Sequence, residues 1–375
     1  MSRLRGLLAA CAMLAVSGCR GSLASTVAGP EVADLVPAVT GVIVIEEPRG
    51  GLVAVHLPRQ EFTTIRSPAP PQPEDRYDIP TIHTVSGPDA DGRVAYIEDH
   101  FFVSDESTRR HLLKTINLAG TDDSAVFTRP GDAMWATSAG GHGEIGAHLA
   151  LSPRGGRVAF MSGLKAVQLP SALLQTGTVE IWDLQTKAVV GSIGSALDEG
   201  LDWFPDGGRL AYVKLVDAKE ATGLMPTGFG TAFQSWPSIP AVFVRDLAQN
   251  TDTLLHVGWN PIVSSDGGFV LVSDMDGPPR MVNDSTRVSD PASWPGMAGS
   301  GAFAVIAPDR VLSWCLPTAG VETSFTTNNS PLVGPKQNLS LKLARLSSRG
   351  FQTVVPKIDP RRQVSFGLNR GPDSR

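Results

Sequence analysis

The chain has 375 residues, of which 42% are apolar, 18% are charged and only 6% are aromatic. A chain of this composition can bury a large core, which excludes an intrinsically disordered protein. The formal net charge is -5. Because nucleic acids are bound largely through lysine and arginine contacts to phosphates, this charge excludes DNA or RNA as an expected partner.

The first 18 residues predict a bacterial export signal. Arg3 and Arg5 supply the positive charge, and the apolar stretch 6–16 is too short to span a bilayer. The stretch ends in Val16-Ser17-Gly18-Cys19, which resembles the lipobox of bacterial lipoproteins. The resemblance implies that Cys19 is acylated and anchors the chain in the cell envelope, on the periplasmic side or in the outer membrane. The alternative is an ordinary signal peptide that is cleaved elsewhere.

Residues 19–38 are small and polar without a clear period, so we expect a flexible tether between the lipid and the fold. Cys11 leaves with the signal and Cys19 carries the lipid, so Cys315 remains alone and no intramolecular disulfide can form. Cys315 lies in the apolar run 311–316, which favours a buried structural thiol over a nucleophile.

A hairpin pattern recurs along the rest of the chain. Residues 151–160 have the sequence LSPRGGRVAF, residues 203–212 WFPDGGRLAY and residues 263–272 VSSDGGFVLV. In this unit an apolar strand leads into a turn where Pro restricts φ, Asp accepts backbone hydrogen bonds and Gly adopts positive φ. A second apolar strand then follows. A looser copy spans residues 85–96, and a shorter copy spans residues 306–312.

Each hairpin is followed by a second pair of short strands. The expected pairs are 112–118 with 125–128, 178–184 with 188–190, 242–247 with 253–255, 280–282 with 286–288, and 341–346 with 351–355. The aligned residues of the hairpins are 93, 157, 209, 269 and 310, so the spacing varies from 41 to 64 residues. This spacing is typical of β-propeller blades and predicts an all-β fold of four-stranded antiparallel blades.

The two ends of the repeat region complement each other. Residues 42–45, 52–57 and 62–65 predict three strands, one fewer than a blade needs, and residues 363–366 predict one further strand. We expect this last strand to be the inner strand of the first blade and to close the ring, which removes an open sheet edge. The prediction is one propeller over residues 39–368 with six blades, or alternatively seven, and a disordered tail over 369–375.

The Pro-Asp-Gly hairpin is similar to the repeat of TolB-like and other WD-repeat-like β-propellers, over about residues 40–368. The resemblance implies the fold but no single activity. The same repeat serves in scaffolds, in receptors and in the non-catalytic domains of peptidases.

Three irregular insertions are expected on the face opposite the Pro-Asp-Gly turns, over residues 163–177, 215–239 and 317–337. The second insertion is rich in apolar side chains, which makes it the predicted binding face. Its candidate residues are Met225, Phe229, Phe233 and Trp236. The alternative is a lid that only packs on its own domain.

His142, Glu144 and His148 form a second candidate site, because imidazole and carboxylate groups suit a divalent metal. The alternative is that His148 packs beside its strand and that His142 is exposed. No G-x-S-x-G, H-E-x-x-H, C-x-x-C or phosphate-binding glycine motif occurs in the sequence.

The leading hypothesis is therefore a lipid-anchored envelope propeller that binds a protein or a small ligand without catalysis and without a cofactor. The alternative is a metal-dependent hydrolase or lyase with its site on the insertion-bearing face. A structural subunit of an envelope assembly is a third possibility.

Overall fold

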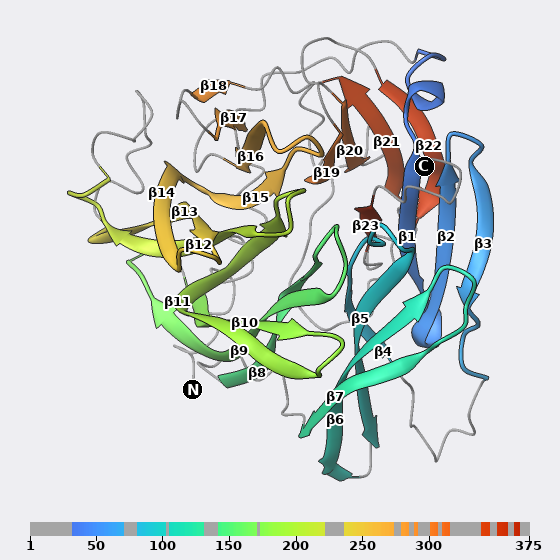
Figure 1. Cartoon of the computed structure of the whole chain (residues 1–375), viewed down its shortest axis with the longest axis horizontal. Coiled ribbons are helices and arrows are strands. Elements are labelled where there is room, and N and C mark those ends of the chain that lie inside the picture. The colour runs from blue at the N-terminus through green and yellow to red at the C-terminus, as the bar shows by residue number, and fades with distance from the viewer. Residues whose placement is uncertain are drawn as a thin grey trace, which may run out of the picture.

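The computed structural model describes residues 32–70, 81–102, 105–130, 142–170, 173–221, 236–273, 279–284, 289–291, 301–306, 310–315, 339–345, 351–358 and 364–367. Within these ranges the regular elements are strands and two 3-10 helices, η2 (Val36–Ala38) and η3 (Pro48–Gly50). The strands form antiparallel sheets arranged around a common centre, as Figure 1 shows. The predicted all-β propeller fold is confirmed. No helix among the described residues is long and apolar enough to cross a membrane.

The first sheet joins the two ends of the repeat region. Its order is β23 (Val364–Gly367), β1 (Gly41–Glu47), β2 (Gly51–Leu57) and β3 (Glu61–Arg66). Strand β23 is antiparallel to β1, with Phe366 opposite Ile43 and Val364 opposite Ile45. The predicted closure of the first blade by the last strand is thus confirmed.

Three further sheets are four-stranded meanders in chain order. They consist of β4 (Thr81–Val85), β5 (Arg93–Phe102), β6 (Asp105–Asn117) and β7 (Ser124–Pro130); of β15 (Trp259–Val263), β16 (Phe269–Ser273), β17 (Arg280–Asn283) and β18 (Ser289–Pro291); and of β19 (Gly301–Ile306), β20 (Arg310–Cys315), β21 (Leu339–Arg345) and β22 (Phe351–Ile358). Strand β17 pairs with Ser289–Pro291, and the expected partner strand 286–288 lies outside the described residues.

The last sheet has seven strands, in the order β14-β13-β12-β11-β10-β9-β8. They are β8 (His142–Leu151), β9 (Arg157–Gln168), β10 (Leu173–Asp183), β11 (Ala188–Trp203), β12 (Arg209–Asp217), β13 (Ser238–Asp246) and β14 (Thr251–Val257). The first part of β11 pairs with β10 and the last part pairs with β12, so β11 belongs to two successive meanders. The six-blade count treats this sheet as two blades and stays a prediction.

Two expected irregular segments are ordered. Residues 163–168 and 173–177 continue β9 and β10 as a paired hairpin, so the first insertion is not an irregular loop. Residues 32–38, expected in the flexible tether, pack on β22. The backbone N–H groups of Leu35 and Val36 donate to Gln352 Oε1 at 3.0 and 2.7 Å, and both side chains are buried. A short apolar run within a polar segment causes this docking.

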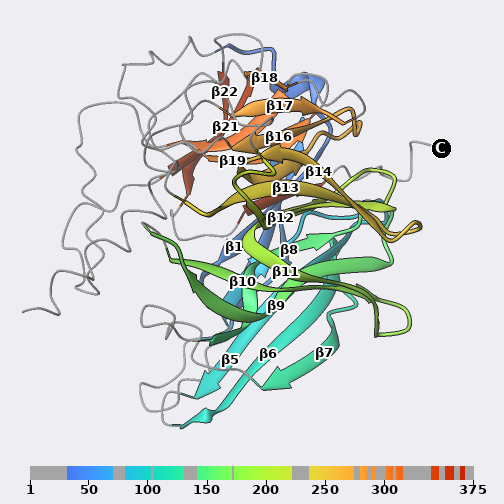
Figure 2. The ribbon, with the colours of Figure 1, turned by 90° about the vertical axis from the view of Figure 1, so that its left-hand side faces the viewer.

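The core lies between facing sheets. Five buried clusters join neighbouring meanders; one joins Ile97 of β5 to Phe160 of β9, and another joins Met161 of β9 to Tyr212 of β12. Figure 2 shows the resulting stack of sheets from the side. Most of the buried apolar side chains therefore lie between the faces of neighbouring blades.

The Pro-Asp-Gly turns also contact each other in sequence. The N–H of Ala90 in the first turn donates to Pro153 O in the second at 2.9 Å. Gly207 in the third turn lies against the second, where an added Cβ would be 3.0 Å from Ser152 Oγ. Gly267 in the fourth turn lies similarly against Pro205. The turns therefore form a continuous row on one face, as expected for structural turns of a meander.

Charged side chains tie neighbouring sheets together near their outer strands. Arg129 of β7 donates to both carboxylate oxygens of Glu180 on β10, at 3.0 and 2.6 Å. Its guanidinium also lies over the rings of Phe127 and Trp182, with distances to the ring centres of 4.8 and 5.7 Å. Burial alone would raise the pKa of Glu180, but hydrogen bonds from Arg129 and other donors outweigh it and lower the pKa. A bidentate, partly buried pair of this kind is directional and strong.

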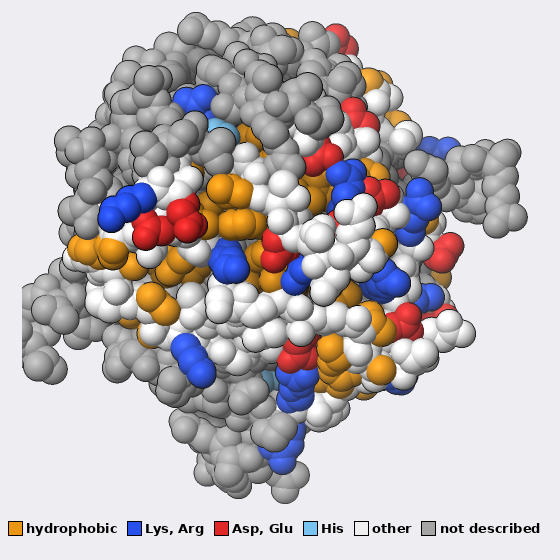
Figure 3. Space-filling model, turned by 60° about the vertical axis from the view of Figure 1, so that its left-hand side comes forward, with side chains coloured by type: hydrophobic (Ala, Val, Ile, Leu, Met, Phe, Trp, Pro, Cys, Tyr) orange, Lys and Arg blue, Asp and Glu red, His pale blue; other side chains and the backbone are white. Residues whose placement is uncertain are grey.

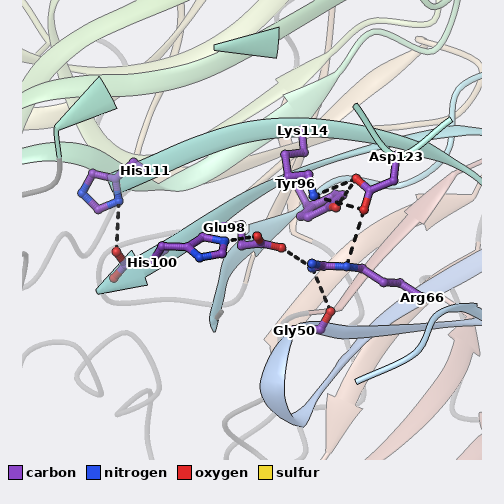
Figure 4. A network of polar contacts seen from close by, with 9 residues as sticks. Gly50, Arg66, Tyr96, Glu98, His100, His111, Lys114 and Asp123 are labelled. Atoms are coloured by element: carbon purple, nitrogen blue, oxygen red, sulfur yellow. Dashed lines mark hydrogen bonds and ion pairs between the residues drawn. The ribbon is translucent and has the colours of Figure 1, made fainter. Parts of the chain in front are cut away.

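A second tie joins the first and second sheets (Figure 4). Arg66 of β3 forms ion pairs with Glu98 of β5 and, at 3.6 Å, with Asp123. Tyr96 donates its hydroxyl to Asp123 Oδ1 at 2.6 Å, and Lys114 lies 3.0 Å from the same carboxylate. Because the two carboxylates are matched by cations of the same network, we assign these residues a structural role.

Candidate binding site on the inner strands

The innermost strands share a departure from regular pairing. In the described residues, β4, β8, β11, β15 and β19 contain extra residues relative to the strand that each faces, which defines a β-bulge. The bulges lie at 82–84 in β4, 145–149 in β8, 197–201 in β11, 259–262 in β15 and 302–304 in β19. Each bulge precedes a hairpin turn by a similar length of chain, so the bulges lie at one level of the ring.

Bulges on neighbouring strands contact each other. Gly200, at φ 115°, lies so close to β15 that an added Cβ would be 2.9 Å from Asn260 Cα. On the other side, His148 Nδ1 lies 2.9 Å from Asp198 Oδ1, which joins the bulges of β8 and β11. Since bulges turn side chains away from the regular ladder and are frequent beside functional sites, these contacts mark a candidate site.

The electrostatics of the site follow from burial. Burial alone would lower the pKa of His148, but the hydrogen bond and the negative charge of Asp198 outweigh it and raise the pKa. For Glu199, burial raises the pKa to about 7, although the nearby His148 opposes this shift. The site therefore holds an imidazole with a raised pKa beside a carboxyl group whose pKa is raised to about 7, and strongly shifted pKa values are common in functional sites.

Asp202 links this site to the next meander. Its Oδ2 accepts the backbone N–H of Val263 on β15 at 2.8 Å, and its Oδ1 accepts the N–H of Trp203 at 2.9 Å. Burial raises the pKa of Asp202 to about 7, even though both hydrogen bonds favour the ionised form. Trp203 in turn donates its indole N–H to Ala150 O of β8 at 3.0 Å. Residues 202 and 203 thus hold three inner strands together below the bulges.

The structure brings together only part of the predicted metal site. His148 pairs with Asp198, whereas the side chains of His142 and Glu144 lie outside the described residues. Among the residues that the structure describes, no group of three or more His, Cys, Asp and Glu side chains is arranged to hold a metal ion. The three-residue metal site stays a prediction.

The predicted apolar binding face is described only at its end. Met225, Phe229 and Phe233 lie outside the described residues, as does Cys19. Trp236 is 2% exposed and belongs to a buried cluster with Leu169, Leu174 and Ala221. Its expected place on an exposed binding face was wrong, because the extended β9–β10 hairpin reaches across and covers it. This residue follows the alternative of a segment that packs on its own domain.

Asp198, Glu199 and Asp202 were not predicted as site residues from the sequence. The run Asp198-Glu199-Gly200 was a usable signal, because it places two acidic residues and a glycine directly before an apolar inner strand. Its pairing with His148 was not visible, since the two residues are 50 positions apart and meet only through the packing of two meanders.

Similarity to known proteins is found at the level of solved structures. No family model matches the sequence, and no curated protein matches it. The structure is similar to TolB from Acinetobacter baumannii, with 11% identity and a TM-score of 0.47 over 88% of this chain and 66% of that one. It is also similar to a putative TolB from Agrobacterium tumefaciens, with 12% identity and a TM-score of 0.46 over 87% of this chain and 98% of that one. A chain of a nidogen/laminin complex has 11% identity and a TM-score of 0.45 over 88% and 98%.

This chain spans 66% of the length of the Acinetobacter protein. The propeller fold is shown by the strand pairing of the chain itself.

The raised pKa values predict an unusual dependence of stability on pH. Glu199 and Asp202, each with a pKa of about 7, hold protons in the folded state that the unfolded chain releases near pH 4. The raised pKa of His148 acts in the same direction. Its contribution to the free energy of unfolding is fully present below about pH 6.5, the pKa of an unperturbed histidine, and is lost as the pH rises through the pKa of His148 in the folded state. We therefore expect the free energy of unfolding to fall between pH 5 and pH 8, by more than the ~1.4 kcal/mol that corresponds to one pKa unit.

Urea unfolding followed by circular dichroism at pH 5, 6, 7 and 8 measures this slope. The variant Asp202→Asn keeps the size and the acceptor oxygen but cannot ionise, so it should be less sensitive to pH than the wild type. Glu61→Gln on an exposed position of β3 is the matched control and should keep the wild-type slope. Stability that is constant or that rises over this range would contradict the assigned pKa shifts.

Proposed function

We propose that this chain is a lipid-anchored binding protein of the bacterial cell envelope, which holds a protein or small-ligand partner at the bulges of its inner strands. The observation that carries the proposal is the contact between the bulges of β8 and β11. It brings His148, Asp198 and Glu199 together from two meanders. Inner-strand positions of a ring are well suited to a binding site, because every blade contributes to them.

The surroundings of the bulges support a binding role. The bulges lie toward the face opposite the Pro-Asp-Gly turns, where the meanders differ most from one another. On that face β9 and β10 extend as a hairpin, and Leu169 and Leu174 of this hairpin pack with Trp236 of the next meander. The extended β9–β10 hairpin is therefore fixed by a buried cluster, so that a partner would bind to a rigid surface there. Long connections on a regular scaffold are frequent sites of recognition.

Charge favours a specific partner over a polyanion. On the face drawn in Figure 3, lysine and arginine side chains are interspersed with aspartate and glutamate, without a broad area of one sign. With a net charge of -5, this surface is suited to a protein or a small polar ligand.

The lipid anchor is proposed from the motif Val16-Ser17-Gly18-Cys19. Cleavage before Cys19 would place the lipid close in sequence to Val32, whose N–H donates to Phe351 O on β22. Residues 20–31 would then be the tether, and the propeller would begin by residue 32, earlier than the sequence alone indicated. Several acyl chains on one cysteine are sufficient for stable membrane attachment.

The metal-dependent hydrolase or lyase remains the alternative hypothesis. It requires His142, Glu144 and His148 to bind one ion. Since Asp198 already occupies Nδ1 of His148, a metal would have to use the other ring nitrogen, with Asp198 orienting the imidazole. Metal analysis of the purified protein distinguishes the two hypotheses, because the binding hypothesis requires no ion.

Partner capture from detergent-solubilised envelopes tests the binding site. The variant Glu199→Gln preserves the shape of the bulge but cannot ionise. The double variant with His148→Asn also removes the ion pair to Asp198. We expect both to recover less of the specific partner, with the double variant losing more than about tenfold, while Glu61→Gln recovers the wild-type amount. Equal recovery by correctly folded double variant and wild type would contradict the site.

The anchor has its own test. Cys19→Ala removes the thiol that the acyl chain requires, so palmitate labelling should be lost and the protein should leave the membrane fraction. Cys11→Ala is the matched control and should keep both. An unchanged membrane fraction for Cys19→Ala would contradict lipid anchoring, and it would leave the binding site to be judged by the capture experiment.

A further inference from the structure

The first Pro-Asp-Gly turn contains a buried carboxyl oxygen without a hydrogen-bond partner. Asp89 is 0% exposed, and its Oδ1 accepts the backbone N–H groups of Asp91 and Arg93 at 3.0 and 2.8 Å. Its Oδ2 is also buried, but no described residue donates a hydrogen bond to it. A buried polar atom is costly when it is left unsatisfied, so the Oδ2 atom points to a further group that binds there.

The Oδ2 atom of Asp89 faces a position where the second turn has no side chain. A Cβ added at Gly155 would lie 2.8 Å from Asp89 Oδ2 and 3.7 Å from Asp91 Oδ2. Outside Gly155 and its two chain neighbours, the three atoms nearest to that point all belong to these two carboxyl groups. Two carboxyl oxygens of the first turn therefore converge on one position beside the second turn.

The same position is neutral at the next two junctions between turns. In each turn the N–H of a glycine donates to the carbonyl oxygen three residues before it, which aligns Asp89 with Ser152 and Phe204. A Cβ added at Gly207 would lie 3.0 Å from Ser152 Oγ, and one at Gly267 would have carbon atoms of the third turn as its nearest neighbours. Among these three junctions, only the first brings two carboxyl groups together.

Asp89 is not neutralised by an ion pair with any residue that the structure describes. In the third turn, by contrast, Asp206 Oδ2 accepts a hydrogen bond from Arg209 Nε at 2.7 Å. Burial raises the pKa of Asp89, although the backbone N–H and the positive charge of Arg93 oppose this shift. A cation bound at Oδ2 would favour the ionised carboxylate and offset the cost of its burial.

We propose that Asp89 Oδ2 and Asp91 Oδ2 bind a calcium ion at the junction of the first and second turns. Calcium suits this donor set because it accepts carboxylate, carbonyl and water oxygens in a flexible geometry, whereas magnesium requires a nearly ideal octahedron. Backbone carbonyl groups and water would supply the remaining ligands, and the exposed side chain of Asp91 gives the ion access from solvent. With only two carboxylates, the dissociation constant should be about 0.1–1 mM.

A calcium ion at this junction would stabilise the part of the ring where the two ends of the repeat region meet. On one side of the first turn, the N–H of Ala90 donates to Pro153 O at 2.9 Å. On the other side lies the closing strand β23, where a Cβ added at Gly367 would be 2.1 Å from Pro88 O. The site belongs to the row of turns, so it is independent of the proposed binding site at the inner-strand bulges.

Equilibrium dialysis of the purified full chain against radioactive calcium tests the site. We expect saturable binding with a midpoint of about 0.1–1 mM. Asp89→Asn keeps the size of the side chain and its Oδ1 acceptor but removes the negative charge, so it should weaken calcium binding about tenfold or more. Asp91→Asn should weaken binding to a similar extent. Asp206→Asn changes the residue before the glycine of the third turn, as Asp91→Asn does in the first, and should bind calcium like the wild type.

Urea unfolding with and without calcium provides a second measurement. Calcium at about 10 mM should raise the urea midpoint of the wild type, because the ion binds only the folded chain, and should not raise that of Asp91→Asn. Asp91 is exposed, so this variant tests the site even if Asp89→Asn folds poorly. A folded wild type that binds no calcium, binding that survives both substitutions in the first turn, or an equal loss in Asp206→Asn would overturn the proposal. An equal rise of the urea midpoint in Asp91→Asn would also overturn it, since calcium would then act elsewhere.

Discussion

The antiparallel pairing of β23 with β1 is the interaction on which the rest of the structure depends. Each sheet buries its faces against its two neighbours, so an open ring would leave two faces without cover. The four residues of β23 supply the inner strand of the first sheet and draw the last meander against it. Closure therefore allows every cluster of the core to form, including the cluster beside the inner-strand bulges.

The closing strand can reach its place only because two glycines allow it. An added Cβ at Gly87 would lie 2.0 Å from Phe366 O, and one at Gly367 would lie 2.1 Å from Pro88 O. The backbones of β23 and of the chain after β4 thus touch directly at the ring's innermost turn. Because Phe366 and Gly367 are held in β23, the absence of a side chain at these two glycine positions is a steric requirement of closure.

The repeat was predictable because its information is local. Pro, Asp and Gly act within one turn, and the apolar strands beside them were placed correctly at β9, β12 and β16. The closing strand was also predictable, since a blade of three strands requires a fourth. The bulges could not be predicted in the same way, because they depend on how two strands far apart in sequence align. His148 and Asp198 belong to different meanders, and only the packing of β8 on β11 brings them together. Trp236 illustrates the same limit: its burial results from an extension of another meander.

Closure is tested most directly by the stability of Gly87→Ala, measured by urea unfolding beside Gly194→Ala. Both changes add one methyl group, but the methyl at residue 194 meets open space, whereas the methyl at residue 87 meets the backbone of Phe366. We expect Gly87→Ala to lower the free energy of unfolding by about 1–3 kcal/mol. Gly194→Ala should change this free energy by less than about 1 kcal/mol. A Gly87→Ala protein as stable as the wild type would contradict closure of the ring by direct contact between its two ends.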